Sequence, residues 1–161
     1  MASSPKGLRL LKTLEQIKNT PSFDATAVLK RVKLHSASDG VLKGSFIIEP
    51  SMCNVAHTLH GGHIASLIDV FSCYSQMSQP DGRLSWTTYM NIIFVESAKE
   101  GETVNVETKP VRSGNAAIVE TCLYGCNGNL LAKGTANFVA GHKKYQQVFK
   151  DEFNFDVYDT N

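Results

Sequence analysis

The sequence predicts an α+β protein in which a single antiparallel β-sheet wraps around a long central helix. Hydrophobic side chains in residues 61–79 surround the helix axis almost completely, which is typical of a buried helix. The stretches on either side alternate between β-branched or apolar segments and short turn signals, which favours antiparallel neighbours. A chain of 161 residues with 42% hydrophobic content can build one core and is too short for two ordinary domains.

The first segment allows two interpretations. Residues 6–18 place leucines and one isoleucine at helical spacing and carry four basic residues against one acid. A basic amphipathic segment of this kind resembles a mitochondrial presequence. Its apolar stripe favours instead a peripheral helix that ends at Thr20-Pro21 and packs on the domain. We therefore assign residues 1–22 to this helix.

The domain itself spans residues 23–141. Residues 26–34 and 41–48 are predicted strands joined at Ser38-Asp39-Gly40, and Pro80-Asp81-Gly82 ends the central helix. Turn signals then separate four further predicted strands, at residues 84–96, 103–111, 116–125 and 130–140. Residues 142–161 form a tail whose aromatic side chains we expect to dock on the surface or on a partner.

Charge and cysteine content exclude several function classes. A net charge of +1 gives no overall field to recruit nucleic acid or an anionic membrane. No apolar run reaches the roughly 18 residues that would predict a membrane span. The four cysteines form no CxxC pair and follow no secretory signal, which favours a reducing compartment. We expect the cytoplasm, with the mitochondrion as the alternative if the first segment is a targeting sequence.

A narrow polar seam runs along the otherwise apolar central helix. Asp69 belongs to it, and an unpaired carboxylate in such a helix would cost several kcal/mol to bury. At the helix start, free backbone N–H groups beside Gly61 can receive a developing oxyanion. The seam consists of Gly62, Ser66, Asp69, Cys73 and Gln76, spaced by four, three, four and three.

Gly61 and Asp69 are too far apart on one helix to act on the same carbonyl. Eight residues at 1.5 Å per residue separate them by about 12 Å. A twofold dimer with antiparallel helices would place the Asp69 of one subunit near the Gly61 of the other. If both groups act on one bond, the site lies between subunits.

A family resemblance rests on several of these residues together. They are Asn54, Leu59-His60-Gly61-Gly62, Asp69, Thr87 and Met90-Asn91. Over residues 8–141 this pattern resembles the hotdog-fold acyl-CoA thioesterases of the PaaI-like branch. The resemblance implies a hotdog fold, a homo-oligomer that is a dimer or a dimer of dimers, and no metal or redox cofactor. It implies hydrolysis of medium-chain, long-chain or aryl acyl-CoA to the free acid and CoA.

The resemblance also implies roles for single residues. Gly61 would donate its N–H to the thioester carbonyl. Asp69 would activate water as general base or act as nucleophile, and both remain open. Asn54 would hold the carbonyl or the water, and Thr87 stands where the family has a water-orienting serine.

A coenzyme-binding turn follows from the same resemblance. It comprises Arg112, Ser113, Gly114, Asn115, Ala116 and Ala117, where a basic side chain and backbone amides would meet phosphates. The predicted substrate-binding set also includes His60, Gly62 and Tyr89. Two positions depart from the family: His57 replaces a glycine, and Asn115 or Ala116 replaces a basic residue of a mammalian relative. Lys143 and Lys144 could supply the missing charge.

Structural interpretations compete with these roles. The three-residue spacing of His57, His60 and His63 could indicate a metal, but no acid or cysteine ligand lies near in the series, so a structural role for His60 at the helix start is favoured. Asp69 could pair with a buried polar group, and Asn54 could serve a turn. The 112–117 segment could be a solvated hairpin. Trp86 and Tyr89 favour strand packing.

Two other functions remain as alternatives. A noncatalytic acyl-CoA-binding module would keep the coenzyme turn and would not need the Asp69 carboxylate. A hotdog enoyl-CoA hydratase would pair the helix aspartate with a histidine five residues later. That position is Tyr74 here, which argues against the hydratase.

Overall fold

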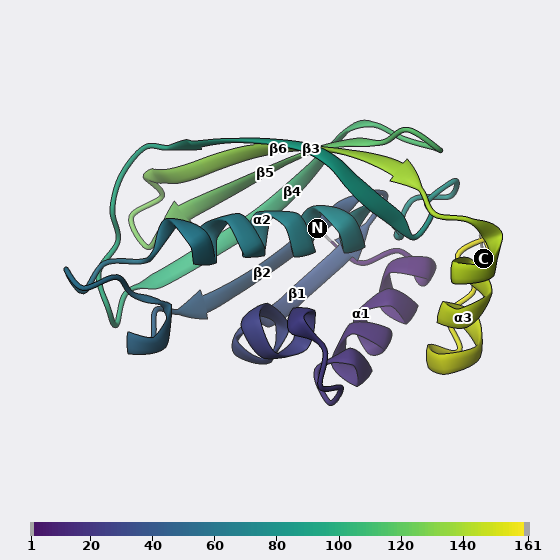
Figure 1. Ribbon diagram of the computed structural model, residues 1–161, viewed down its shortest axis with the longest axis horizontal. Helices are drawn as coiled ribbons and strands as arrows, with labels where there is room; N and C mark the ends of the chain where they lie inside the picture. Colours follow the sequence, from purple (N-terminus) through teal and green to yellow (C-terminus); the bar gives the residue numbers. More distant parts are fainter. Residues whose placement is uncertain (1, 160–161) are drawn as a thin grey trace.

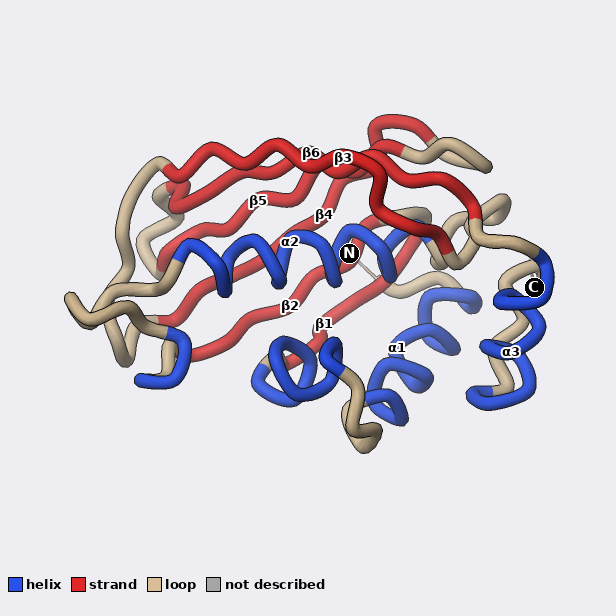
Figure 2. The backbone as a smooth tube through the Cα atoms, viewed as in Figure 1, coloured by secondary structure: helices blue, strands red, loops and turns tan. Residues whose placement is uncertain are grey.

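Six antiparallel strands form one sheet within residues 2–159, the part of the chain that this computed structural model describes. The strand order is β1-β2-β4-β5-β6-β3, and helix α2 lies along one face of the sheet (Figures 1 and 2). The strands are β1 (Lys33–Ser38), β2 (Val41–Ile47), β3 (Ser85–Phe94), β4 (Thr103–Arg112), β5 (Ile118–Gly125) and β6 (Leu130–Ala140). The predicted α+β class and sheet-around-helix architecture are confirmed.

Among the described residues, three longer helices and three short ones accompany the sheet. They are α1 (Pro5–Ile17), α2 (Gly61–Gln76), α3 (Lys143–Phe153), the π-helical η1 (Asp24–Val28), and the 3₁₀ turns η2 (Leu29–Arg31) and η3 (Pro50–Met52). Helix α2 ends three residues before the predicted residue 79. None of the helices in residues 2–159 has both the length and the apolar character needed to cross a bilayer.

The prediction of a strand at residues 26–34 is wrong for most of its length. Those residues run through η1 and η2, and β1 begins only at Lys33. Ala25, Val28 and Leu29 are fully buried, and their spacing of three and four residues puts them on one face of a helical turn. The β-branched composition of this segment therefore serves a helical packing surface, because tertiary burial overrides strand propensity.

Helix α2 packs on the sheet through an apolar face. Ile64, Leu67, Ile68 and Phe71 are buried against it. Gly134 of β6 admits this close approach, because a Cβ there would lie 2.7 Å from the Ile68 side chain. These contacts fix the position of α2 relative to β3 and β6. The position of the helix in turn determines which part of the surface the polar residues of α2 face.

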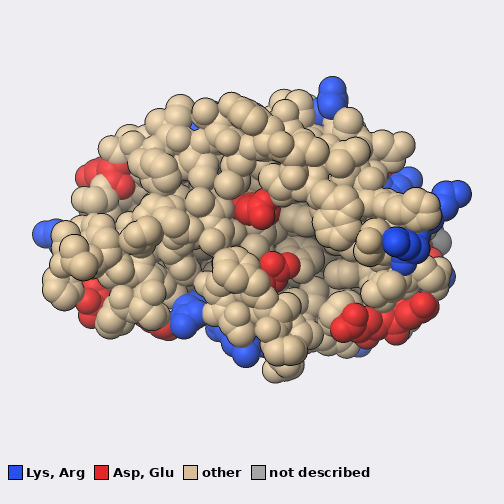
Figure 3. Space-filling view, viewed as in Figure 1, with Lys and Arg blue, Asp and Glu red and all other residues tan. Residues whose placement is uncertain are grey.

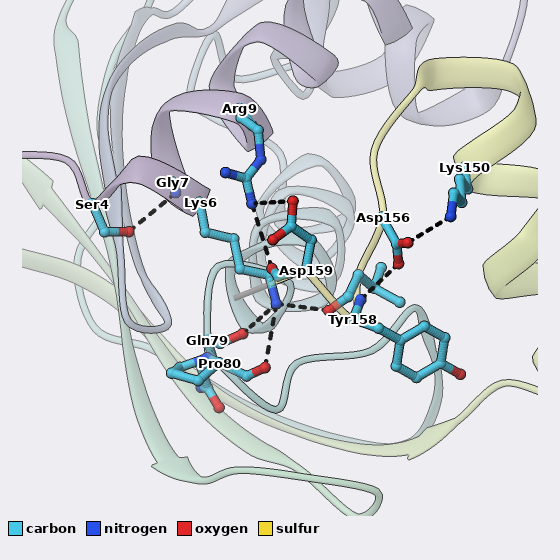
Figure 4. A network of polar contacts seen from close by, with 11 residues as sticks. Ser4, Lys6, Gly7, Arg9, Gln79, Pro80, Lys150, Asp156, Tyr158 and Asp159 are labelled. Atoms are coloured by element: carbon cyan, nitrogen blue, oxygen red, sulfur yellow. Dashed lines mark hydrogen bonds and ion pairs between the residues drawn. The ribbon is translucent and has the colours of Figure 1, made fainter. Parts of the chain in front are cut away.

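Lys6 joins the two ends of the chain to the end of α2 (Figure 4). Its Nζ donates to the carbonyl oxygens of Gln79 and Val157, both at 2.7 Å, and the side chain is only 4% exposed. Burial, with the nearby Arg83 and Arg9 guanidinium groups, lowers the pKa of Lys6 from 10.5 to about 8. Helix α1 is thus a packed part of the domain.

The tail docks on its own domain. Helix α3 lies beside α1 at one end of the molecule (Figure 1), and Phe149, Phe155 and Val157 are buried in the main core. Phe149 packs against Tyr74 of α2 with ring centroids 6.4 Å apart. The tail therefore completes a wall next to the central helix.

Candidate active site

Asp69 and Thr87 meet where α2 lies against β3. The Thr87 hydroxyl donates to Asp69 Oδ1 at 2.5 Å. Asp69 is half-buried in the single chain, whereas its apolar neighbours in the sequence predict full burial. The difference arises because the polar seam of α2 reaches the surface of the chain. Figure 3 shows two separate acidic spots near a hollow in the middle of one face of the molecule, with most other charged side chains at its margins. The carboxylate is thus held by one hydroxyl and accessible to a ligand.

A cavity of about 390 Å³ surrounds this pair, which we call the Asp69 cavity. Asp24, Tyr74 and Trp86 line it together with Asp69 and Thr87. Cys73 is also part of the wall, and burial, with the Asp69 charge, raises the pKa of its thiol to about 12. At neutral pH this thiol therefore stays protonated.

The start of α2 leaves one backbone donor free. His60 Nδ1 accepts from the Gly62 N–H at 2.8 Å, and the His60 carbonyl accepts from His63 and Ile64. Within residues 2–159, the Gly61 N–H has no acceptor. His60 thus makes a structural hydrogen bond at the helix start, and within the described residues the Gly61 N–H is left unpaired.

Gly61 faces a second cavity of about 370 Å³, which we call the Gly61 cavity. Asn54, Thr58 and Phe94 share its lining. The Asn54 carboxamide oxygen accepts from the Ala56 and Thr58 N–H groups, and its nitrogen donates to the Thr58 hydroxyl. Asn54 therefore shapes the loop and retains one amide hydrogen that can reach a ligand.

The Asp69 and Gly61 cavities have no lining residue in common. The helix rise puts the two residues about 12 Å apart. One chain consequently presents two separate polar features: a backbone N–H at one end of α2, and a carboxylate with its hydroxyl further along.

The predicted coenzyme turn lies elsewhere, between β4 and β5. Gly114 has a φ of 88°, and Arg112 Nε donates to the Ala116 carbonyl. The Asn115 and Ala117 carbonyls accept from β6. Asp81 comes close to the turn, since a Cβ on Gly114 would lie 3.3 Å from its carboxylate. None of residues 112–117 lines the Asp69 or Gly61 cavity, and neither does Tyr89.

The three histidines before and within α2 make different contacts. His57 has a φ of 58° and an exposed ring whose Nδ1 lies 3.6 Å from Glu100. The departure from glycine therefore strains the loop without narrowing the cavity. His63 packs edge-on against Phe46, and burial, with Arg31, lowers its pKa. With His60 capping α2, the three rings do not converge.

Sequence reasoning missed Asp24 and Tyr74 in the Asp69 cavity. The Tyr74 hydroxyl donates to Asp24 Oδ2 at 2.7 Å, across 50 positions of sequence. Asp24 lies at the start of the unpredicted η1 segment. Periodicity could place Tyr74 on α2, but no local pattern indicates which residue meets it.

Comparisons with known proteins identify the class. The Thioesterase superfamily family model matches residues 56–122. Mouse acyl-coenzyme A thioesterase 13 is 30% identical over 136 residues, which cover 83% of this chain and 94% of that protein.

Solved structures agree on the fold. Zebrafish thioesterase superfamily member 2 has a TM-score of 0.76 at 29% identity, over 81% of this chain and 96% of that one. The E. coli PaaI protein shares the fold, with a TM-score of 0.71 at 16% identity over 84% and 96% of the two chains. The architecture is the hotdog fold, as predicted. The chain belongs to the thioesterase superfamily.

Proposed function

We propose that this thioesterase hydrolyses acyl-CoA to a free acid and coenzyme A at a site shared between two subunits. The observation that carries the proposal is that two separate cavities lie along α2. One contains the free Gly61 N–H, and the other contains the Asp69 carboxylate. Neither half alone provides both an oxyanion donor and a base. The mouse relative's name, acyl-coenzyme A thioesterase, supports the choice of thioester.

The edge of the sheet offers the surface for the second subunit. Strand β3 pairs only with β6, so its other edge is open within the described chain. Its exposed apolar side chains include Tyr89 (59% exposed) and Ile93 (58%). Such an edge is a template for pairing with another strand.

The course of β3 also fits the two half-sites. Thr87 near its start lines the Asp69 cavity, and Phe94 at its end lines the Gly61 cavity. Antiparallel pairing of two β3 edges brings the start of one strand to the end of the other. Each Asp69 cavity then meets the partner's Gly61 cavity. We propose a homo-oligomer, a dimer or a dimer of dimers, on this basis.

The chemistry assigns each group one task. Water attacks the thioester carbon, Asp69 accepts its proton, and the carbonyl oxygen becomes an oxyanion bound by the partner's Gly61 N–H. Collapse of the intermediate breaks the C–S bond and expels the CoA thiolate, which takes up the proton. In the nucleophilic alternative, Asp69 attacks first and water cleaves the resulting anhydride. Thr87 positions the carboxylate in both cases.

We assign CoA recognition to residues 112–117 with Lys143 and Lys144, and further substrate contacts to Asn54, His60, Gly62 and Tyr89. The proposed substrates have medium, long or aryl acyl groups. For location we propose the cytoplasm, with the mitochondrion as the alternative, on the strength of four free cysteines.

The test measures thiol release from a panel of acyl-CoA substrates. Wild type should release CoA, and Asp69→Asn should lower kcat at least about a hundredfold because the base is lost. Asp151→Asn, an exposed acid on α3 outside both cavities, is the control and should keep wild-type rates. A variant that binds acyl-CoA but releases no thiol supports catalysis by Asp69. A wild type that binds acyl-CoA but hydrolyses none favours a binding module.

A further inference from the structure

A third cavity adjoins the Asp69 cavity, and the hydrogen bond between Tyr74 and Asp24 lies between the two. We call it the α3 cavity. Its volume is about 380 Å³, and it lies where the end of α1, the start of η1, and helices α2 and α3 meet. It shares only Asp24 and Tyr74 with the Asp69 cavity. These two side chains therefore form the partition between the cavities.

The partition is a single side-chain contact between α2 and η1. The Tyr74 hydroxyl donates to Asp24 Oδ2 at 2.7 Å. Burial and the Asp24 charge raise the pKa of Tyr74, so its phenol remains a donor across the neutral range. Asp24 begins a five-residue π-helical segment, a backbone form that is uncommon outside functional sites. Displacing one hydrogen bond would join the two cavities.

The linings select an uncharged ligand. Asp24 lines both cavities, Asp69 lines the first and Glu152 lines the second, and none of the described residues lining either is basic. A phosphate would be repelled at both. Ile17, Pro21, Phe149 and Phe153 give the α3 cavity an apolar part that suits a hydrocarbon, and the hydroxyl side chains of Thr20 and Ser22 also line it.

Helix α3 supplies part of the wall of this cavity. It begins at Lys143, after the stretch of residues 8–141 that carries the family resemblance. Phe149 and Phe153 of α3 line the cavity together with Ile17 of α1. The cavity therefore depends on the docking of α3 against the rest of the domain.

We propose that the α3 cavity receives the distal end of a long acyl chain whose thioester lies at Asp69, and that the chain displaces the Tyr74–Asp24 hydrogen bond to reach it. This inference rests on the proposed acyl-CoA hydrolysis and deepens it. Burial of several methylene groups outweighs the loss of one hydrogen bond. The partition therefore opens for long chains and stays closed for short ones.

The first test fills the α3 cavity and compares kcat/KM for palmitoyl-CoA with that for butyryl-CoA. Glu152→Trp places a large ring at the cavity wall and should lower the palmitoyl-to-butyryl ratio by about tenfold, the loss expected when about two methylene groups are no longer buried. Asp151→Trp makes the same change of charge and introduces the same ring one position away, outside the cavity, and should keep the wild-type ratio.

The second test acts on the partition. Tyr74→Phe keeps the ring and removes the hydrogen bond to Asp24, so the palmitoyl-to-butyryl ratio should rise severalfold. An unchanged ratio in both Glu152→Trp and Tyr74→Phe, with butyryl-CoA still hydrolysed by wild type, overturns this inference alone. A wild type that hydrolyses neither substrate overturns the proposed function and the inference together.

Discussion

At the scale of single residues, the free N–H of Gly61 allows a sharp test of its role. Gly61→Pro removes this N–H at the first position of a helix, where proline is tolerated, and His60 already has the extended backbone that precedes proline. We expect kcat to fall roughly a hundredfold to a thousandfold in a thiol-release assay.

Gly61→Ala is the matched control for that change. It adds a Cβ about 3.3 Å from the Phe94 ring, as proline does, but keeps the N–H. Most of the activity should therefore survive in the alanine variant. Equal losses in the two variants would assign the effect to crowding against Phe94.

The backbone conformation of His57 lowers the stability of the fold, and a glycine at this position would relieve the strain. Its φ of 58° is a left-handed conformation in which a Cβ is disfavoured. We expect His57→Gly to raise the free energy of unfolding by about 1 kcal/mol, measured by urea denaturation. His57→Ala keeps the Cβ and loses the contact with Glu100, so it should give no gain. A gain in the alanine variant would show that the imidazole, and not the backbone, is unfavourable.

Lys6 makes stability depend on pH in alkaline solution. Its pKa is about 8 in the folded chain and near 10.5 when unfolded, so between these values the unfolded chain binds more protons. The free energy of unfolding contributed by Lys6 therefore rises with pH across this window and is lost as pH falls through about 8. Lys6→Met has no such group. The stability of wild type relative to Lys6→Met should increase from pH 8 to pH 10, and a constant difference would contradict the shifted pKa.

At the scale of elements, the contact between α2 and β6 sets the position of Asp69. Gly134→Ala would push a Cβ into Ile68, the neighbour of Asp69, and should destabilise the fold by about 1–3 kcal/mol. Thermal unfolding measures the loss. Thr135→Ala changes the next residue on the strand, which is not packed under α2, and should have little effect. Equal losses would place the sensitivity in β6 itself.

Sequence patterns predicted the elements whose signals are local. Strand β6 was predicted with its observed limits, because a turn signal precedes it and apolar residues run along it. Residues 26–32 were assigned wrongly, since a short run of β-branched residues does not reveal a π-helical turn. Helix α3 was not predicted, because its charged sequence gains stability from docking through Phe149.

The candidate site divides in the same way. The rise of an α-helix predicts from the sequence alone that Gly61 and Asp69 lie far apart, and the two separate cavities agree with that distance. The family resemblance marked Thr87 as a residue that orients water, but its hydrogen bond to Asp69 was not predicted, since the two residues lie on different elements. The Tyr74–Asp24 contact depends on how η1 packs against α2, which spacing along the chain does not encode.

At the scale of the whole molecule, complementation tests whether the site spans two subunits. Asp69→Asn and Gly61→Pro chains are each inactive alone under the proposal. A mixed dimer would contain one doubly altered site and one intact site, because the intact Gly61 and Asp69 come from different chains. Random mixing should restore about a quarter of wild-type activity, since half of the dimers are mixed and each has one good site of two. A site within one chain would restore none.

The Lys6 contacts also couple the movements of distant segments. Lys6 Nζ binds the carbonyl oxygens of Gln79 and Val157 at the same time, and 151 positions of sequence separate Lys6 from Val157. If the segment that carries Val157 detached, a buried ammonium would lose one of its acceptors. Local opening of this segment is therefore expected to loosen the start of α1 as well.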